Sequence, residues 1–171
     1  MGMQDHNQGH EGRGHWLAVE LKRLPGAEDL PPPTYATEGS VGADLHAAID
    51  EPVTIRRGTI TLIPTGVAIG LPPGFEAQIR PRSGLALKNG LVMVNSPGTI
   101  DWDYRGELKV ALTSVLDQPT TLRRGDRIAQ LVVAPVVRCH WVLKDHLTAT
   151  ERAEKGFGHT GVQPRELGQT S

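Results

Sequence analysis

Short runs in which apolar and polar residues alternate, each ended by glycine or proline, constrain the fold of this sequence most. The apolar members of these runs are Leu17, Val19 and Leu21; Ile60 and Leu62; Val67, Ile69 and Leu71; Phe75, Ala77 and Ile79; and Leu108, Val110 and Leu112. A period of two places each set on one face of a β-strand. Many short strands with frequent turn signals, here 20 glycines and 13 prolines in 171 residues, are typical of a β-sandwich or barrel. The sequence therefore predicts an all-β fold, a single antiparallel domain.

Three segments depart from that alternation. Residues 83–88 predict a short helix that ends at Asn89 and Gly90, and residues 145–152 predict a weaker one. Residues 127–137 are apolar on both faces, which indicates a central strand or a strand buried between chains.

The two ends of the chain are polar and rich in glycine. Residues 1–15 have no apolar period, which favours a disordered leader over a metal site built from the three histidines His6, His10 and His15. We expect residues 16–150 to form the β domain and residues 151–171 to form a flexible C-terminal arm and tail.

Composition excludes several classes of function. The 18 Lys and Arg residues against 19 Asp and Glu give a net charge of −1, which lacks the basic excess of a protein that binds nucleic acid. The aromatic content of 4% is too low for a platform that stacks single-stranded bases. The sequence has no apolar run of about 20 residues, so we expect no membrane partner. Cys139 is the only cysteine, which excludes an internal disulfide and fits a cytoplasmic location.

Five short segments place charged or polar residues beside glycine, where a backbone approaches a ligand closely. In the first, residues 40–45, Asp44 is either a turn residue bonded to its own backbone or a site residue. In the second, residues 80–85, two arginines end a strand before Ser83 and Gly84 open the short helix. That arrangement aims guanidinium, hydroxyl and amide donors at one place, which predicts a phosphate site; in the alternative interpretation Ser83 is a simple helix cap.

The third segment, residues 95–106, is the richest in chemistry. Two carboxylates, Asp101 and Asp103, lie with Tyr104 in a hairpin-like stretch. Hairpin tips suit the recognition of small ligands because their backbone groups are not all paired. The alternative interpretation makes the carboxylates turn residues and the tyrosine a core edge.

The fourth segment, residues 124–131, is a turn that enters the apolar strand. A pairing of Asp126 with an arginine explains most of it, but Gln130 needs a hydrogen-bond partner in so apolar a strand. In the fifth segment, residues 152–161, three glycines match the spacing GxGxxG. No βαβ unit surrounds them, so we reject a dinucleotide site and predict a mobile basic arm with one aromatic residue.

Together and in this order, the five segments resemble those of the homotrimeric deoxyuridine triphosphate nucleotidohydrolases (dUTPases), from about residue 16 to residue 161. The resemblance implies a jelly-roll-like antiparallel β domain of the β-clip type. It implies three chains around a threefold axis, with active sites at the contacts between chains. It also implies hydrolysis of dUTP to dUMP and pyrophosphate, with Mg²⁺ as cofactor, which keeps uracil out of DNA and supplies dUMP for thymidylate synthesis.

The resemblance further implies roles for individual residues. Asp101 would deprotonate the water that attacks the α-phosphorus, and Gln130 would help to place that water or the phosphate. Tyr104 would pack flat against deoxyribose and exclude a 2′-hydroxyl, while Asp44 would bind waters on the Mg²⁺ ion. The residues that would read uracil are Asn95, Gly98 and Ile100, and those that would hold the phosphates are Arg82, Ser83 and Gly84.

By the same resemblance, the fifth segment would close over the site as an arm. The contacts implied for it are Arg152 with the γ-phosphate, Phe157 on uracil, and His159 and Thr160 with the phosphates. The chain departs from the family pattern at Ala153 and Lys155, where glycine is usual, which implies a stiffer hinge and an extra cation.

Two rival functions remain open on the sequence alone. A dCTP deaminase shares the trimeric fold and a similar apolar strand, but it needs a glutamate proton shuttle and lacks counterparts of Tyr104 and of the Phe157 arm. A non-catalytic module that binds nucleotide and signals through protein contacts is the other rival. The presence of every implied catalytic group argues against it.

Overall fold

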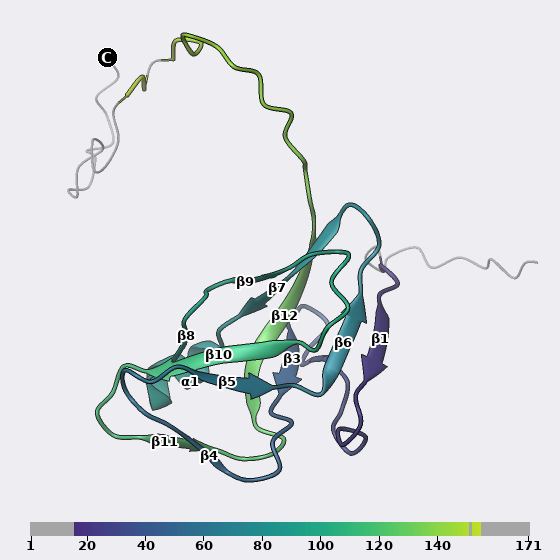
Figure 1. Cartoon of the computed structure of the whole chain (residues 1–171), viewed down its shortest axis with the longest axis vertical. Helices are drawn as coiled ribbons and strands as arrows, with labels where there is room; N and C mark the ends of the chain where they lie inside the picture. The colour runs from purple at the N-terminus through teal and green to yellow at the C-terminus, as the bar shows by residue number, and fades with distance from the viewer. Residues whose placement is uncertain (1–15, 151, 155–171) are drawn as a thin grey trace, which may run out of the picture. The chain divides into compact units, whose positions relative to one another are not determined.

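The computed structural model describes residues 16–150 and 152–154 (Figure 1). Within them the chain forms strands and one short helix, which confirms the all-β prediction. In chain order the elements are β1 (Glu20–Arg23), β2 (Thr34–Tyr35), β3 (Ala43–His46), β4 (Val53–Ile55), β5 (Thr61–Pro64), β6 (Val67–Gly70), β7 (Phe75–Arg80), α1 (Ser83–Asn89), β8 (Leu91–Met93), β9 (Gly98–Ile100), β10 (Lys109–Ser114), β11 (Thr120–Leu122) and β12 (Arg127–Pro135). The chain divides into two units, one that ends at Val137 and one that begins at Arg138.

The strands of the first unit pair antiparallel and pack as a sandwich. The largest sheet has the order β2-β3-β12-β7-β9, and a second has the order β5-β10-β8, while β1 pairs with β6 and β11 with β4. Leu45 and Ile79 from the largest sheet share one buried core with Ile63 and Val110 from the second. The domain is therefore of the jelly-roll type that the resemblance implied.

β12 is the central strand of the largest sheet, as its two apolar faces predicted. It ends at Pro135, two residues short of the expected end, because proline has no N–H to continue the ladder. Its register places Gln130 between Asp44 of β3 and Arg80 of β7. The sheet thus brings together the first, second and fourth segments of chemical interest.

The period of two is correct for both β10 and β5, but its apolar face is buried only in β10. All three apolar residues of the run at 108–112 are buried. At β5, Ile60 just before the strand and Leu62 within it are 64% and 58% exposed, whereas Ile63 is buried. Ile63 therefore supplies the core contact of this strand, and Leu62 faces outward.

The helix predicted at residues 83–88 is present as α1 and ends as expected. Gly90 has a φ of +62°, the left-handed region that favours glycine, and its N–H donates to the carbonyl of Ala86. Arg82 is the N-cap residue and makes no side-chain cap bond, so the interpretation of Ser83 as a simple cap is wrong. Ser83 and Gly84 are instead exposed in the first turn of the helix.

The second predicted helix is wrong for the residues that the structure describes. Residues 145–150 form no helical turn, and all of them are exposed. So short a helix is marginal in water without tertiary packing, and these residues bury no side chain that would stabilise it. Within residues 16–150 and 152–154, no helix has the length and apolar content that a bilayer crossing requires.

Candidate functional site

Asp44 lies between two arginines that the sheet brings to it from distant parts of the chain. Arg82 follows β7 and Arg127 opens β12. Arg82 Nε is 2.9 Å from Asp44 Oδ1, and Arg127 Nη1 donates to Asp44 Oδ2 over 3.2 Å. Asp44, with 14% of its side chain exposed, is thus a carboxylate with two charged partners, and the turn-residue alternative is wrong. We call Asp44, Arg82, Arg127 and Gln130 the Asp44 cluster.

Gln130 has the partner that its apolar strand requires. Its Nε2 donates to the carbonyl of Pro81 at 2.9 Å, which ties the side chain to the segment that carries Arg82. The carboxamide also lies against Gly42, where any Cβ would overlap Gln130 Oε1. Glycine at position 42 therefore leaves the room that Gln130 occupies.

The ion pair expected within the fourth segment is wrong. The Asp126 carboxylate accepts the backbone N–H of Arg123 at 2.7 Å and thereby closes the turn before β12. Arg124 pairs with Asp29 instead, with 3.0 Å between Nε and Oδ2, and this bond holds the pKa of the Asp29 carboxyl below its usual value. Asp126 therefore bonds within its own turn, and Arg124 pairs with a carboxylate from a distant part of the chain.

His46 adjoins the Asp44 cluster on the same strand. It lies opposite Arg127 in the register and is half-buried. Burial lowers the pKa of the imidazole below its ordinary value, the Asp44 carboxylate opposes that shift, and the two arginines of the cluster add to it. The folded protein therefore favours neutral His46.

We expect His46 to make the fold less stable in mild acid. As the pH falls through about 6.5, the unfolded chain binds a proton that the folded chain resists, so the free energy of unfolding decreases. The melting temperature should be lower at about pH 5.5 than at about pH 7.5. This decrease should be smaller in His46→Gln than in the native protein, by roughly 1–3 °C. His140→Gln, which changes an exposed histidine, is the control, and an equal effect of both substitutions would contradict this expectation.

A second group of predicted residues lines a pocket of about 380 Å³, which we call the Asp101 pocket. Its lining residues are Leu62, Thr99, Ile100, Asp101, Tyr104, Glu107 and Lys109. Asp101 follows β9, and its carbonyl accepts the N–H of Tyr104 at 3.1 Å, which folds the chain into a turn. The carboxylate and the aromatic ring therefore line the same hollow.

Tyr104 is fixed by contacts at the far end of its ring. Its hydroxyl donates to the carbonyl of Glu107 at 3.1 Å. A Cβ at Gly106 would overlap that hydroxyl, so glycine at 106 lets the ring lie along the turn. Tyr104 is 44% exposed, which rules out the core-edge alternative and leaves the ring accessible to a ligand.

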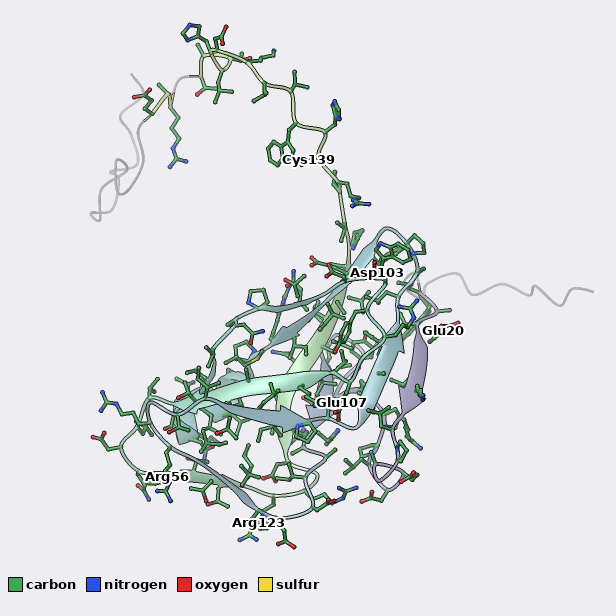
Figure 2. The ribbon with its side chains drawn as sticks, viewed as in Figure 1. Glu20, Arg56, Asp103, Glu107, Arg123 and Cys139 are labelled. Carbon is green, nitrogen blue, oxygen red and sulfur yellow. The ribbon has the colours of Figure 1, made fainter. Side chains whose placement is uncertain are left out.

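Sequence reasoning missed four lining residues of this pocket, Leu62, Thr99, Glu107 and Lys109. Glu107, labelled in Figure 2, accepts the N–H of Gly66 at 3.0 Å through Oε1, and its Oε2 lies 3.5 Å from Lys109 Nζ. The sequence offered a signal for Lys109, because it is the polar residue between two apolar ones just after the third segment. Leu62 offered no such signal, since it reaches the pocket only through the pairing of β5 with β10.

The stretch that leads to Asp101 is not a hairpin, contrary to expectation. β8 pairs with β10, whereas β9 pairs with β7, so the chain crosses here from one sheet to the other. β9 joins β7 because Gly98 is buried against Ile79, with a distance of 3.6 Å from the Cβ site of Gly98 to Ile79 Cβ. The amide of Asn95 lies 3.2 Å from the same Cβ site, so Asn95 and Gly98 are neighbours.

A single chain does not bring the Asp44 cluster and the Asp101 pocket together. The last residue of β9 faces Ala77 of β7, and Asp101 is the next residue along the chain. Asp44 of β3 is level with Arg80 of β7, because both face Gln130 of the intervening strand β12. Strand geometry therefore separates Asp101 from Asp44 by roughly 13 Å along the strands and roughly 14 Å across them, or about 20 Å in all.

The other predicted residues lie towards the ends of the chain. Phe157, His159 and Thr160, with the glycines of the fifth segment, lie outside the described residues, as do residues 1–15 with their three histidines. Arg152 is described and exposed. Ala153 beside it has a φ of +46°, in the left-handed region, so the backbone here has the conformation that suits the glycine of the family pattern.

Asp44 offers a place for a hydrated cation. In residues 16–150 and 152–154, no group of three or more His, Cys, Asp or Glu side chains is placed to hold a metal ion. A cation ligated wholly by protein therefore does not fit this part of the chain. A carboxylate that accepts hydrogen bonds from the water ligands of an ion does fit Mg²⁺, which keeps several waters when bound. Each oxygen of Asp44 has a second lone pair for such a bond.

A comparison with protein families decides which family the chain represents, because a family model described as dUTPase matches residues 28–161. The chain belongs to the dUTPase family. Among curated dUTPases, the deoxyuridine 5′-triphosphate nucleotidohydrolase of Desulfotalea psychrophila is 56% identical over 146 residues, which cover 84% of this chain and 97% of the relative. The one of Caldanaerobacter subterraneus subsp. tengcongensis is 51% identical over 146 residues, which cover 85% of this chain and 99% of the relative.

Solved dUTPase structures agree with the fold. The dUTPase of Staphylococcus bacteriophage 80alpha with dUPNHPP superposes with a TM-score of 0.74 at 25% sequence identity. The match covers 85% of this chain and 99% of the phage chain. The dUTPase match thus extends from the sequence to the arrangement of the strands.

Proposed function

We propose that this chain hydrolyses dUTP to dUMP and pyrophosphate. The observation that carries the proposal is the Asp101 pocket, in which a carboxylate and the ring of Tyr104 line one hollow in a chain of the dUTPase family. The curated relatives named above are deoxyuridine 5′-triphosphate nucleotidohydrolases and are identical to this chain at about half of the aligned positions. The reaction removes the precursor of uracil in DNA and supplies dUMP for thymidylate synthesis.

Asp101 acts as the general base in this proposal. Hydrolysis at the α-phosphorus depends on a water that is positioned and deprotonated against the negative charge of the phosphates. The exposed carboxylate of Asp101 is open to such a water. Gln130, held by its bond to Pro81, helps to place the water or the phosphate.

Selectivity for sugar and base is assigned to the Asp101 pocket and its neighbours. The Tyr104 ring packs flat against deoxyribose, and its bond to the Glu107 carbonyl prevents it from moving aside for a 2′-hydroxyl. Asn95 and the backbone at Gly98 and Ile100 read uracil. Cytosine reverses the donor and acceptor at two of its ring-edge positions and is therefore rejected.

The phosphates are assigned to the start of α1 and to the C-terminal arm. Guanidinium groups form strong, charge-assisted bonds to phosphate oxygens, which suits Arg82 beside the exposed Ser83 and Gly84. Residues 151–171 form the arm in this proposal and close over the bound nucleotide. The arm contacts are Arg152 with the γ-phosphate, Phe157 on uracil, and His159 and Thr160 with the phosphates.

Mg²⁺ is the proposed cofactor, with Asp44 as its ligand through water. When bound to the triphosphate, the ion neutralises charge on the phosphate oxygens. Asp44 accepts hydrogen bonds from the waters of the ion, and Arg127 keeps the carboxylate in place.

The proposed active form is a homotrimer that shares each site between chains. The separation of about 20 Å between Asp101 and Asp44 supports this, because both must reach the phosphates of one nucleotide. In a shared site, the Asp101 pocket of one chain faces the Asp44 cluster of another.

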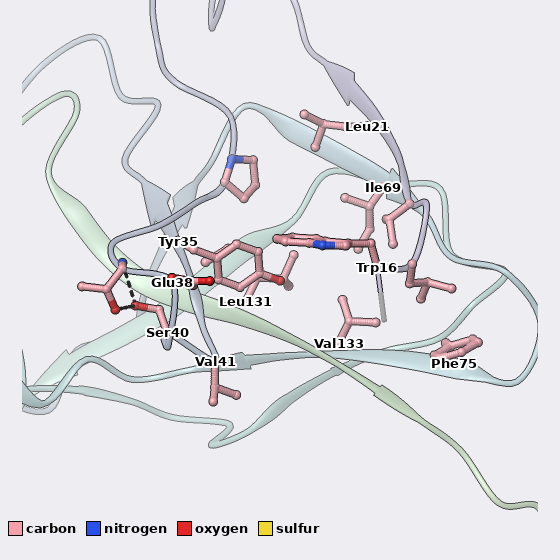
Figure 3. Close-up of a pocket in the computed structure, with 15 residues that line it drawn as sticks. Trp16, Leu21, Tyr35, Glu38, Ser40, Val41, Ile69, Phe75, Leu131 and Val133 are labelled. Carbon is pink, nitrogen blue, oxygen red and sulfur yellow. Dashed lines mark hydrogen bonds between the residues drawn. The ribbon is translucent and has the colours of Figure 1, made fainter. Parts of the chain in front are cut away.

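Exposed apolar surface supports the same assembly. The rings of Trp16 and Tyr35 line a hollow of about 960 Å³ (Figure 3). Trp16 is 79% exposed and Tyr35 is 46% exposed. Of the predicted site residues that the structure describes, none lines this hollow. In the second unit, Trp141 and Leu143 are 84% and 100% exposed. Large apolar side chains that gather on a surface mark contacts with other protein chains.

The proposed location is the cytoplasm, and the proposed partners are dUTP and further copies of the chain. Cys139 is an exposed free thiol, which fits a reducing compartment. Because positive and negative residues are nearly equal in number, we propose neither a nucleic acid nor a membrane as a partner.

The proposal is tested by separate incubations of the purified protein and Mg²⁺ with dUTP, dCTP, UTP and dTTP, with products resolved by ion-exchange chromatography. We expect dUMP and pyrophosphate from dUTP, and turnover at least about a hundredfold slower with the other three nucleotides. Formation of dUTP from dCTP would identify a deaminase instead. No turnover of any nucleotide would identify a binding module.

A further inference from the structure

Arg105 folds back onto the turn that carries Asp101 and Tyr104. Its Nη1 donates to the carbonyl of Trp102 at 2.7 Å and to the carbonyl of Tyr104 at 2.9 Å. The two bonds bridge carbonyls on either side of Asp103, and each is strengthened by the charge of the guanidinium. Arg105 therefore holds the middle of the turn, where no strand pairing supports the backbone.

The same side chain also lies against β6. The site where a Cβ of Gly70 would stand is 3.5 Å from Arg105 Nε and 2.6 Å from a carboxylate oxygen of Glu20, labelled in Figure 2. Gly70 and Glu20 are opposite each other in the pairing of β1 with β6. A Cβ at position 70 would overlap Glu20 and would be in van der Waals contact with Arg105, so the guanidinium lies close against this sheet.

We propose that Arg105 is a positioning residue that selects deoxyribose over ribose by fixing the Tyr104 ring. Arg105 does not line the Asp101 pocket, so it acts through Tyr104, whose own carbonyl it binds. The inference rests on the proposed role of Tyr104 as the wall against the sugar. A wall excludes one hydroxyl group only if it stays in place to within a fraction of an ångström. Arg105 binds the carbonyl of Tyr104, whereas the N–H of the tyrosine donates to Asp101 and its hydroxyl donates to Glu107.

The rest of the turn keeps other anchors when Arg105 is removed. Glu107 still accepts the N–H of Gly66, and the N–H of Leu108, which is fully buried, still donates to Val67 at 2.8 Å. The loss of Arg105 should therefore loosen the backbone that carries the Tyr104 ring, so that the ring shifts about its remaining hydroxyl bond to Glu107, without unfolding the domain. Selectivity, rather than stability, is the property that should change.

The test compares kcat/KM for dUTP and for UTP in the native protein, Arg105→Met, Arg105→Lys and Tyr104→Leu. Arg105→Met keeps the length of the side chain and removes its donors. We expect it to lower kcat/KM for dUTP by about tenfold to a hundredfold, as small misplacements near a reacting centre do, and to leave UTP nearly unchanged. Arg105→Lys should keep most of the dUTP-to-UTP ratio, because an ammonium group has protons for both carbonyls.

Arg57→Met is the matched control, because Arg57 is also an exposed arginine, with Asp117 as its partner at 2.7 Å, and it lies outside both site groups. If Arg105→Met slows dUTP and UTP equally, its dUTP-to-UTP ratio of kcat/KM is unchanged. That result, together with a smaller ratio in Tyr104→Leu, would overturn the role of Arg105 and leave the role of Tyr104 intact. An unchanged ratio in Tyr104→Leu would overturn the sugar role of Tyr104 and the inference with it. If Arg105→Met does not fold, Arg105→Gln, whose shorter amide cannot reach both carbonyls, takes its place.

Discussion

Asp101→Asn should lower the kcat of dUTP hydrolysis by about three orders of magnitude, which is within the range that a general base contributes. Asparagine has nearly the shape of aspartate but no basic oxygen, so a water at this position is no longer deprotonated. The side chain of Asp101 is exposed in a turn, and the fold should therefore tolerate the change. Single-turnover hydrolysis measures the chemical step, and titration with a non-hydrolysable dUTP analogue measures binding, which should be retained.

Asp103→Asn is the matched control for this prediction. It makes the same change two residues along the same turn, at an exposed carboxylate that does not line the Asp101 pocket. We expect its kcat to stay within about threefold of the native value, as is usual for a surface change that touches no reacting group. Full hydrolysis by Asp101→Asn would show that the base is assigned to the wrong residue.

Two inactive variants should restore activity when they are assembled together. Asp101→Asn damages the Asp101 pocket, and Arg82→Ala damages the Asp44 cluster, which lies about 20 Å away in the same chain. If each site takes one group from each of two chains, every trimer that contains both variants has one site in three, roughly a third of its sites, that combines a native Asp101 with a native Arg82. Co-expression with two different affinity tags, followed by purification through both, gives the mixed trimers for a steady-state dUTPase assay.

The recovery separates shared sites from sites within one chain. If Asp101 and Arg82 served the same site from the same chain, no site in the mixture would contain both, and the activity would stay at the level of the single variants. Asp101→Asn mixed with the double variant Asp101→Asn/Arg82→Ala is the control, since it can assemble equally well but contains no native Asp101. Recovery in that control would point to contaminating host enzyme.

Local chemistry made part of the fold predictable from sequence. The run at 108–112 became β10 because its apolar face is needed in the core, and α1 ends at Gly90 because a left-handed residue closes a helix most easily as glycine. Gln130 could be recognised as a residue that needs a partner, since an amide in an apolar strand is costly to leave unpaired. The identity of that partner, the Pro81 carbonyl, depends on the pairing of β12 with β7.

What could not be predicted depends on pairing between distant strands. Leu62 enters the Asp101 pocket because β5 lies beside β10, a neighbour relation that no local pattern encodes. The chain crosses between sheets before Gly98, since β8 pairs with β10 and β9 pairs with β7, and both partners are distant in the sequence. The helix expected at residues 145–152 failed in its described part because propensity alone does not stabilise a short helix.

Because Arg82 is paired with Asp44, substrate that binds Arg82 as proposed has to replace the carboxylate of Asp44 with a phosphate. In the free protein, a carboxylate oxygen of Asp44 lies where a phosphate oxygen would bind the Arg82 guanidinium. If Arg82 moves to a phosphate as proposed, Asp44 keeps Arg127, so the carboxylate, with only 14% of its side chain exposed, retains a cation. In this proposal, an incoming anion must compete with a carboxylate that the protein itself supplies, and nucleotides with fewer phosphate charges should compete less well. Asp44 would thus set a threshold of charge that a ligand has to exceed before it binds Arg82.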